Sequence, residues 1–262
     1  MKTYLDKIML WHRMRAKDDH RDVKELIRMT HDLPPTRPLS KSLTEQSGVS
    51  IIAEVKRRSP SKGELAPDIS VSDQVASYVQ GGAKGISILT DREFFSGSMD
   101  DIKLARTLTD LPILRKDFTV SELDVLDARL IGADAVLLIA AALSVEEVVR
   151  FSDLAHRVGL EVLLEVHNEE ELAQLDDSVA DILGINQRDL TTFSVDTTRA
   201  LKLSKLVPAG LVKITESGVS DPEQLTTLSK AGFDGALIGE ALIRAKSPEE
   251  LLRAFVTAGR GL

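Results

Sequence analysis

The feature that most constrains the fold is a regular alternation, from residue 51 onward, of short apolar runs with longer stretches of helical periodicity. The eight apolar runs cover residues 51–56, 85–90, 112–117, 133–139, 160–166, 181–186, 211–216 and 234–239. Runs this short and this apolar are typical of strands buried on both faces, and strands that alternate with helices form a parallel sheet. Eight such units favour an α/β fold in which the sheet closes into a single (β/α)8 TIM barrel.

Local helix signals support this alternation. SVEE at 144–147 is a capping box, and SPEE at 247–250 combines an N-cap serine with proline at the first helical position. Two apolar stripes have helical spacing: Val71, Val75, Tyr78 and Val79, and then Val145, Val148, Val149 and Ala155. An open doubly wound sheet is the alternative. It would be expected to carry G-x-G-x-x-G after its first strand, and no such motif stands there.

Residues 1–48 lack the pattern of the rest of the chain. Apolar residues from Tyr4 to Trp11 suit an amphipathic helix, a second is expected around 23–29, and Pro34, Pro35 and Pro38 then break the chain. We expect a single domain over 1–262, with 1–48 as an N-terminal helical extension that covers one end of the barrel and 49–262 as the barrel itself.

Composition excludes several function classes. The chain has no cysteine, so disulfides, thiolate nucleophiles and cysteine-ligated metals are ruled out. Its net charge of -8 argues against nucleic acid as a main partner. No apolar run approaches the roughly 18 residues of a membrane span, and the first residues lack a signal-peptide pattern. We therefore expect a cytoplasmic protein that needs neither membrane nor nucleic acid, present as a monomer or a weak homodimer.

Ionisable side chains stand at the ends of five of the predicted strands, where the interiors are almost wholly aliphatic. The first strand leads through Glu54 and Lys56 into a basic loop, in the stretch IIAEVKRRSPSKG. Side chains alternate along a strand, so both share the face of Ile52. Lys116, Glu165 and Glu216 likewise share their faces with inward-facing aliphatic residues. Because barrel enzymes form their sites where strands end, we favour a catalytic group over surface ion pairs.

Lysines and carboxylates that face one another in a semi-closed mouth shift each other's pKa values. Such a mouth can hold a general acid and a general base together. Gly218 and Gly239 follow the last two strands, at the usual phosphate site of such barrels. No metal-ligand motif is present, and the five histidines are scattered; His167 is expected to be a loop residue. We expect neither a metal nor a cofactor.

The chain resembles the indole-3-glycerol phosphate synthases, barrel enzymes of the tryptophan pathway. The resemblance extends from about residue 50 to 245, through the segments IAEVKRRSPSKG, SILTD, FFSGS, ILRKDF, GADAVLLIAAAL, LEVLLEVHNEEEL, GINQRDLTTF, ESGVSDPEQL and ALIGEAL. It implies closure of the indole ring in 1-(2-carboxyphenylamino)-1-deoxyribulose 5-phosphate, with loss of CO₂ and water. The expected ligand is thus a small anion that carries a carboxylate and a sugar phosphate.

The resemblance also implies roles for single residues. Lys116 would be the general acid that activates the substrate ketone, and Glu165 the general base or proton shuttle of the dehydration. Lys56 would hold the substrate carboxylate and is a second candidate acid. Glu54 would orient Lys116 and is a candidate to share in proton transfer. Substrate hydroxyls and lysines would be positioned by Asn186, Arg188, Glu216 and Ser217. The phosphate would lie among Ser59, Gly218, Gly239 and Glu240, and the aromatic ring would be walled by Phe95, Phe118 and Leu137.

Three positions depart from the pattern expected for this family: Gln187, Thr215 and Glu240. A carboxylate turned toward phosphate would repel it, and the parity of Glu240 predicts that it turns away. Two rival interpretations remain open for the residues alone. One is a Schiff-base aldolase with Lys56 or Lys116 as nucleophile, and the other is a silent barrel that binds phosphorylated metabolites. Phosphoribosylanthranilate isomerase is disfavoured because its usual base is a cysteine.

Overall fold

A closed barrel of parallel strands forms the centre of the molecule. The computed structural model describes residues 3–60, 62–66, 68–173, 179–189 and 192–261. Within these ranges the barrel has the strand order β1-β10-β9-β8-β7-β6-β5-β4, closed by the pairing of β1 with β4. The strands are β1 (Ser50–Val55), β4 (Gly85–Leu89), β5 (Ile113–Lys116), β6 (Ala135–Ile139), β7 (Glu161–Val166), β8 (Ile182–Asn186), β9 (Val212–Glu216) and β10 (Gly235–Ile238). The predicted fold class is confirmed, and each strand lies within two residues of its expected bounds.

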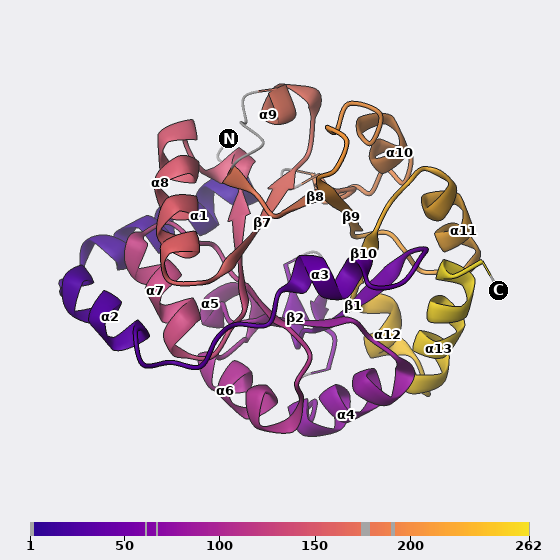
Figure 1. Ribbon diagram of the computed structural model, residues 1–262, viewed down its shortest axis with the longest axis horizontal. Coiled ribbons are helices and arrows are strands. Elements are labelled where there is room, and N and C mark those ends of the chain that lie inside the picture. The colour runs from indigo at the N-terminus through magenta and orange to yellow at the C-terminus, as the bar shows by residue number, and fades with distance from the viewer. Residues whose placement is uncertain (1–2, 61, 67, 174–178, 190–191, 262) are drawn as a thin grey trace.

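Helices surround this barrel as an outer ring (Figure 1). They are α4 (Val71–Gly81), α5 (Arg92–Phe95), α6 (Met99–Leu108), α7 (Glu122–Leu130), α8 (Val145–Arg157), α9 (Glu169–Ala173), α10 (Arg199–Leu203), α11 (Glu223–Lys230), α12 (Glu240–Arg244) and α13 (Pro248–Gly259). A 3-10 turn, η1 (Ala140–Ala142), follows β6, and a small hairpin, β2 (Arg58–Ser59) with β3 (Gly63–Glu64), follows β1. No described helix has both the length and the apolar character needed to cross a membrane.

The predicted caps form, but the two predicted apolar stripes are wider than the buried faces of their helices. Ser144 and Glu147 make the reciprocal capping box of α8, and Ser247 caps α13, which has Pro248 in its first turn. Val79, Val145 and Val149, however, are exposed rather than buried. The side chain missing from the predicted α8 stripe is Phe151, which is fully buried. A helical period of 3.6 residues is compatible with several adjacent choices of apolar face. Only the packing against the strands determines which of these residues are buried.

The barrel interior holds a separate aliphatic cluster below the strand ends. Along each strand, the residues of this cluster alternate with residues that face the outer helices. The cluster contains Ile52, Leu114, Leu137, Leu163, Ile182, Ile214 and Leu237 from the strands, with Leu39 and Leu43 from the N-terminal extension. The strand parity predicted for Lys116, Glu165 and Glu216 is therefore confirmed, since each continues one of these inward rows. The polar groups stand on an apolar floor.

The N-terminal extension contacts both ends of the barrel, which corrects the expectation that it covers only one. Helices α1 (Tyr4–Lys17) and α2 (Val23–Thr30) match the prediction, whereas α3 (Leu39–Thr44) was not predicted because Pro38 was interpreted as a breaker. Pro38 is instead the N-cap of α3. Figure 1 shows α3 lying across the end of the barrel. There Ser42 Oγ donates to Lys84 O at 2.6 Å and Ser50 Oγ to Leu43 O at 2.7 Å, so α3 plugs the amino-terminal mouth.

The plug makes a stability prediction. Leu43 is fully buried in the interior cluster, so Leu43→Ala should lower the free energy of unfolding by about 2–5 kcal/mol, the usual cost of a leucine cavity. Leu10→Ala is the matched control, because Leu10 on α1 is 50% exposed, and it should cost under about 0.5 kcal/mol. Urea titrations would measure both. Equal losses would mean that α3 is not part of the cooperative core.

Candidate active site

A cavity of about 650 Å³ opens at the carboxyl ends of the strands. Every residue predicted for the site lines it: Glu54, Lys56, Ser59, Phe95, Lys116, Phe118, Leu137, Glu165, Asn186, Arg188, Glu216, Ser217, Gly218, Gly239 and Glu240. Each of the barrel strands, or the loop that follows it, contributes at least one of these residues. The closed topology thus brings together groups as far apart in sequence as residues 54 and 240.

Lys116 at the end of β5 is the central cation. Its Nζ lies 2.8 Å from Glu165 Oε2 and 3.1 Å from Glu216 Oε2. Burial alone would lower the pKa of Lys116, but the charges of Glu165, Glu216 and Glu54 outweigh burial and raise it. The side chain of Lys116 is 14% exposed, against 1% and 2% for the two glutamates. A protonated amine therefore faces the cavity with two carboxylates behind it.

The two glutamates that share this lysine have different pKa values. Burial would raise the pKa of Glu165, but the charge of Lys116 and the contact with His167 hold it well below its usual range. For Glu216, burial prevails over the attraction of Lys116, and with the nearby charge of Glu165 it raises the pKa to about 7. Carboxylates whose environments separate their pKa values are suited to different proton-transfer tasks. Glu165 is the ionised member of the pair.

Lys56 and Glu54 form a second ion pair at the same mouth. The Lys56 ammonium donates to Glu54 Oε1, and both side chains come from the end of β1. This differs from the expectation that Glu54 orients Lys116: Glu54 contacts Lys56 and reaches Lys116 only through its charge. The side chain of Lys56 is 17% exposed and lines the cavity. The Lys56 ammonium is thus a second cation in the cavity.

Asn186, the last residue of β8, and Arg188, two residues further on, make polar contacts with Glu165 and with the rim of the cavity. Asn186 Nδ2 donates to Glu165 Oε1 at 3.0 Å, and its own Oδ1 accepts from Arg188 N at 2.9 Å. The Arg188 guanidinium donates to Phe193 O at 3.1 Å. Asn186 therefore fixes one carboxylate oxygen of Glu165, and Oε2 is left toward Lys116.

Glycines clear the space that two of the carboxylates occupy. A Cβ on Gly184 would lie 2.2 Å from Glu216 Oε1, and one on Gly239 would lie 2.2 Å from Glu54 Oε1. Non-bonded atoms do not approach this closely, so any side chain at either position would displace a carboxylate. Gly239 was predicted for backbone approach to a phosphate. Its clearance of Glu54 is a second reason for glycine there.

Aromatic side chains line the other wall. Phe95 and Phe118 have ring centroids 6.2 Å apart, and both line the cavity together with Leu137. Phe95 is set by Asp91, whose Oδ1 accepts from Phe94 N at 2.6 Å and from Phe95 N at 3.0 Å. This wall is apolar, whereas the side chains at the strand ends beside it are charged.

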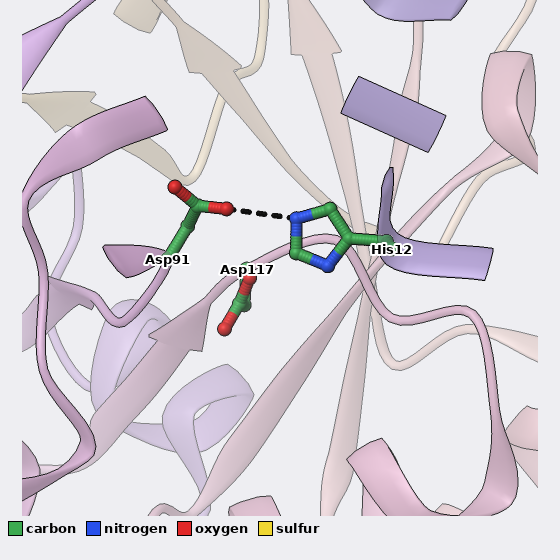
Figure 2. A group of neighbouring side chains, drawn as sticks. All are labelled: His12, Asp91 and Asp117. Atoms are coloured by element: carbon green, nitrogen blue, oxygen red, sulfur yellow. Dashed lines mark hydrogen bonds and ion pairs between the residues drawn. The ribbon is translucent and has the colours of Figure 1, made fainter. Parts of the chain in front are cut away.

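A histidine of α1 supports that wall from behind, and sequence reasoning missed it. His12 Nε2 lies 2.8 Å from Asp91 Oδ2, with Asp117 close to the same ring, as Figure 2 shows. The His12 ring centroid is also 5.3 Å from that of Phe118. The one available signal was the aspartate within two residues of the strand end in both SILTD and ILRKD. Nothing in the sequence pairs these acids with residue 12.

The same three residues have the spacing of a metal site, with candidate ligand atoms within 4.8 Å of one another. Their carboxylate oxygens are already engaged, however. Asp117 Oδ1 accepts from Phe118 N at 2.8 Å, and Oδ2 accepts from Arg115 Nη2 at 3.0 Å and from the Thr90 hydroxyl. Asp91 caps α5 and pairs with His12. These contacts account for the cluster as support for the wall, and the expectation of no metal stays a prediction.

The far rim is polar and lies after β9 and β10. Ser217, Gly218 and Gly239 line it, with Ser59 from the β2 hairpin. Glu240 also lines it, and its carboxylate is 3.1 Å from Arg244 Nε and 3.9 Å from Arg188 Nη2. The expectation that this carboxylate turns away from the cavity is therefore not confirmed. Both of its cationic partners line the cavity as well, so its charge is offset where it stands.

His167 does follow β7 in a loop, as expected, yet its side chain is only 9% exposed. Its Nε2 is 3.3 Å from Glu165 Oε1. The sequence could have predicted this contact. Side chains alternate along a strand, so residue 167 occupies the next inward-facing position after residue 165.

Comparison with known proteins finds similar sequences over nearly the whole chain. Residues 5–255 match the family model described as indole-3-glycerol phosphate synthase. Among similar proteins, the indole-3-glycerol phosphate synthase of Bacteroides thetaiotaomicron is 44% identical over 236 residues, which cover 90% of each chain. That of Kineococcus radiotolerans is 40% identical over 263 residues, covering 98% of this chain and 96% of the relative.

Solved structures of lower identity share the fold. The thiamine phosphate pyrophosphorylase from Pyrococcus furiosus superposes with a TM-score of 0.63 at 18% identity, covering 86% of this chain and 98% of that one. KGPDC from Streptococcus mutans gives a TM-score of 0.61 at 15% identity, covering 82% and 99%. At these identities the likeness shows the barrel fold alone.

Proposed function

This chain belongs to the indole-3-glycerol phosphate synthase family, and from that premise we propose how its cavity residues divide the reaction. It is an enzyme, with the carboxy-lyase activity of that family in tryptophan biosynthesis. The observation that carries the division of roles is the position of Lys116, between an ionised Glu165 and a Glu216 whose pKa is about 7.

The proposed substrate is 1-(2-carboxyphenylamino)-1-deoxyribulose 5-phosphate, whose two anionic ends and central ring fit the lining of the cavity. The ring lies against Phe95 and Phe118, and the benzoate carboxylate is held by Lys56. The phosphate lies at the rim formed by Ser59, Gly218 and Gly239. This assignment is supported by the separation of an apolar wall from two polar ends within one cavity.

In the ring-closing step, Lys116 Nζ protonates the ketone oxygen while the ring carbon that bears the carboxylate attacks the ketone carbon. The new C–C bond leaves that ring carbon tetrahedral. Loss of CO₂ then returns the electron pair of the broken bond to the ring and restores its aromaticity. The raised pKa of Lys116 supports an acid and argues against a Schiff-base nucleophile, which must be a neutral amine.

In the dehydration step, Glu165 removes a proton from the carbon next to the new hydroxyl-bearing centre, and the hydroxyl leaves as water after protonation. Its low pKa keeps Glu165 ionised before the step. Asn186 holds its Oε1, so Oε2 is the oxygen that accepts the proton. Lys56 lines the same mouth and protonates the leaving hydroxyl, with Glu54 as its partner. Glu216 orients Lys116.

The test is direct. The purified chain is offered the carboxyphenylamino-deoxyribulose phosphate, and indole fluorescence and released CO₂ are followed together. One CO₂ for each indole formed is the expected result, and substrate binding without either product would refute turnover and favour a silent barrel. Oligomeric state and cellular location stay predictions.

A further inference from the structure

His167 stands behind the proposed base rather than in the cavity. It follows β7 with the inward parity of Glu165 and is not among the residues that line the cavity. Its Nε2 approaches Glu165 Oε1 to 3.3 Å as an ion pair. The same oxygen accepts from Asn186 Nδ2 at 3.0 Å. Oε1 is therefore engaged from two sides, while Oε2 faces Lys116.

The start of α9 brings a second carboxylate to the other side of this imidazole. Asn168 caps the helix, since its Oδ1 accepts from Glu171 N at 2.8 Å, and its Nδ2 donates to Glu171 Oε1 at 2.7 Å. Glu171 Oε2 then accepts from His167 N at 2.8 Å and lies 3.3 Å from His167 Nδ1. The cap thus fixes Glu171 against the histidine ring, and the sequence HNEEE supplies all three residues.

Each ring nitrogen lies 3.3 Å from a carboxylate oxygen, and the contact of Nε2 with Glu165 is an ion pair without hydrogen-bond geometry. Only the imidazolium places a charged N–H beside both carboxylates. Burial alone would lower the pKa of His167, but the contacts with Glu165 and Glu171 prevail and raise it to about 9. A raised pKa means that the positive charge is present at neutral pH and is lost only as the pH rises through about 9. Glu165 is thereby placed between two cations, His167 and Lys116.

Resting on the proposed role of Glu165 as base, we propose that His167, held by Glu171, is a positioning residue that keeps Glu165 ionised and fixes its Oε1 edge. The charged groups facing Glu165 are Lys116 from β5, Glu216 from β9 and His167 itself; Glu171 faces His167 from α9.

A buried ammonium and carboxylate 2.8 Å apart can become neutral by passing the proton between them, which would deprive the reaction of both its acid and its base. A second cation beside the carboxylate opposes that transfer, because it stabilises the charged form.

NMR titration tests the electrostatic part without substrate. In protein with labelled histidine and glutamate, His167 should titrate near pH 9, and Glu171→Gln should lower that midpoint by about one unit because it removes one paired charge. Glu170→Gln is the matched control, an exposed residue of the same helix, and should leave the midpoint unchanged. His167→Gln should raise the titration midpoint of the Glu165 carboxyl by about one unit or more. A His167 that titrates near its ordinary value of about 6.5, or an unmoved Glu165, overturns the proposal.

Turnover tests the functional part. His167→Gln should move the acid limb of kcat/KM upward by about one pH unit, and Glu170→Gln should not. A loss of equal size at every pH would mark a merely structural role and overturn the proposal. If His167→Gln does not fold, the proposal is tested by Glu171→Gln, through the titration midpoint of His167. If the titrations behave as expected but the unmodified protein makes no indole product, the proposed function fails while the coupling of His167 to Glu165 stands.

Discussion

Replacing Lys116 by methionine should reduce kcat by roughly 10³-fold, in the range expected when a positioned general acid is lost. Methionine keeps an unbranched apolar stem of similar length, so the aliphatic floor beneath it is preserved. The loss should be the same for CO₂ release and for indole formation, because the acid acts before either product appears. Rapid-quench single turnovers that measure both products would check this.

Lys56→Met is the informative comparison, because Lys56 is the second lysine that lines the cavity. It should raise KM for the carboxylate-bearing substrate more than it lowers the rate of ring closure. If both lysine variants lost the same factor at every step, the assignment of separate roles would be wrong. Lys202→Met, at a side chain that is 69% exposed, controls for the removal of one positive charge. Circular dichroism melts would show whether Lys116→Met still folds when Glu216 loses its cation and Glu165 keeps only the ion pair with His167.

The fold was predictable because its signals are local and repeated. Each strand is marked by an aliphatic run, and helices are marked by a cap such as Ser144 or by a stop such as Gly82. Closure into a barrel then fixes which side chains converge. The inward parity of Lys116, Glu165 and Glu216 could therefore be predicted from the alternation of side chains along each aliphatic run.

What the sequence could not supply is the pairing between segments. Glu54 was expected beside Lys116 and instead contacts Lys56, because the choice between two lysines of one mouth depends on side-chain rotamers. His12 lies 79 residues from Asp91, and no local pattern connects them. Pro38 was interpreted as a breaker because proline both ends and begins helices, and only the burial of α3 distinguishes the two.

Glu165→Gln should separate the two halves of the reaction. The amide keeps the shape of the side chain and a contact for Asn186, but it cannot accept the proton in the dehydration. We expect indole formation to fall by roughly 10²- to 10⁴-fold, the range for a lost general base. CO₂ release should fall far less, since ring closure depends on the Lys116 acid.

The decisive measurement is the order of the two products in a single turnover. In the unmodified enzyme CO₂ and indole fluorescence should rise together, whereas in Glu165→Gln the release of CO₂ should run ahead and a non-fluorescent, ring-closed intermediate should accumulate. Glu170→Gln, the same substitution at an exposed position, should behave like the unmodified enzyme. Equal slowing of both products in Glu165→Gln would place its role before decarboxylation. Since Glu165 touches Lys116 at 2.8 Å, that outcome would mean that it acts mainly by holding the acid rather than as the base of the last step.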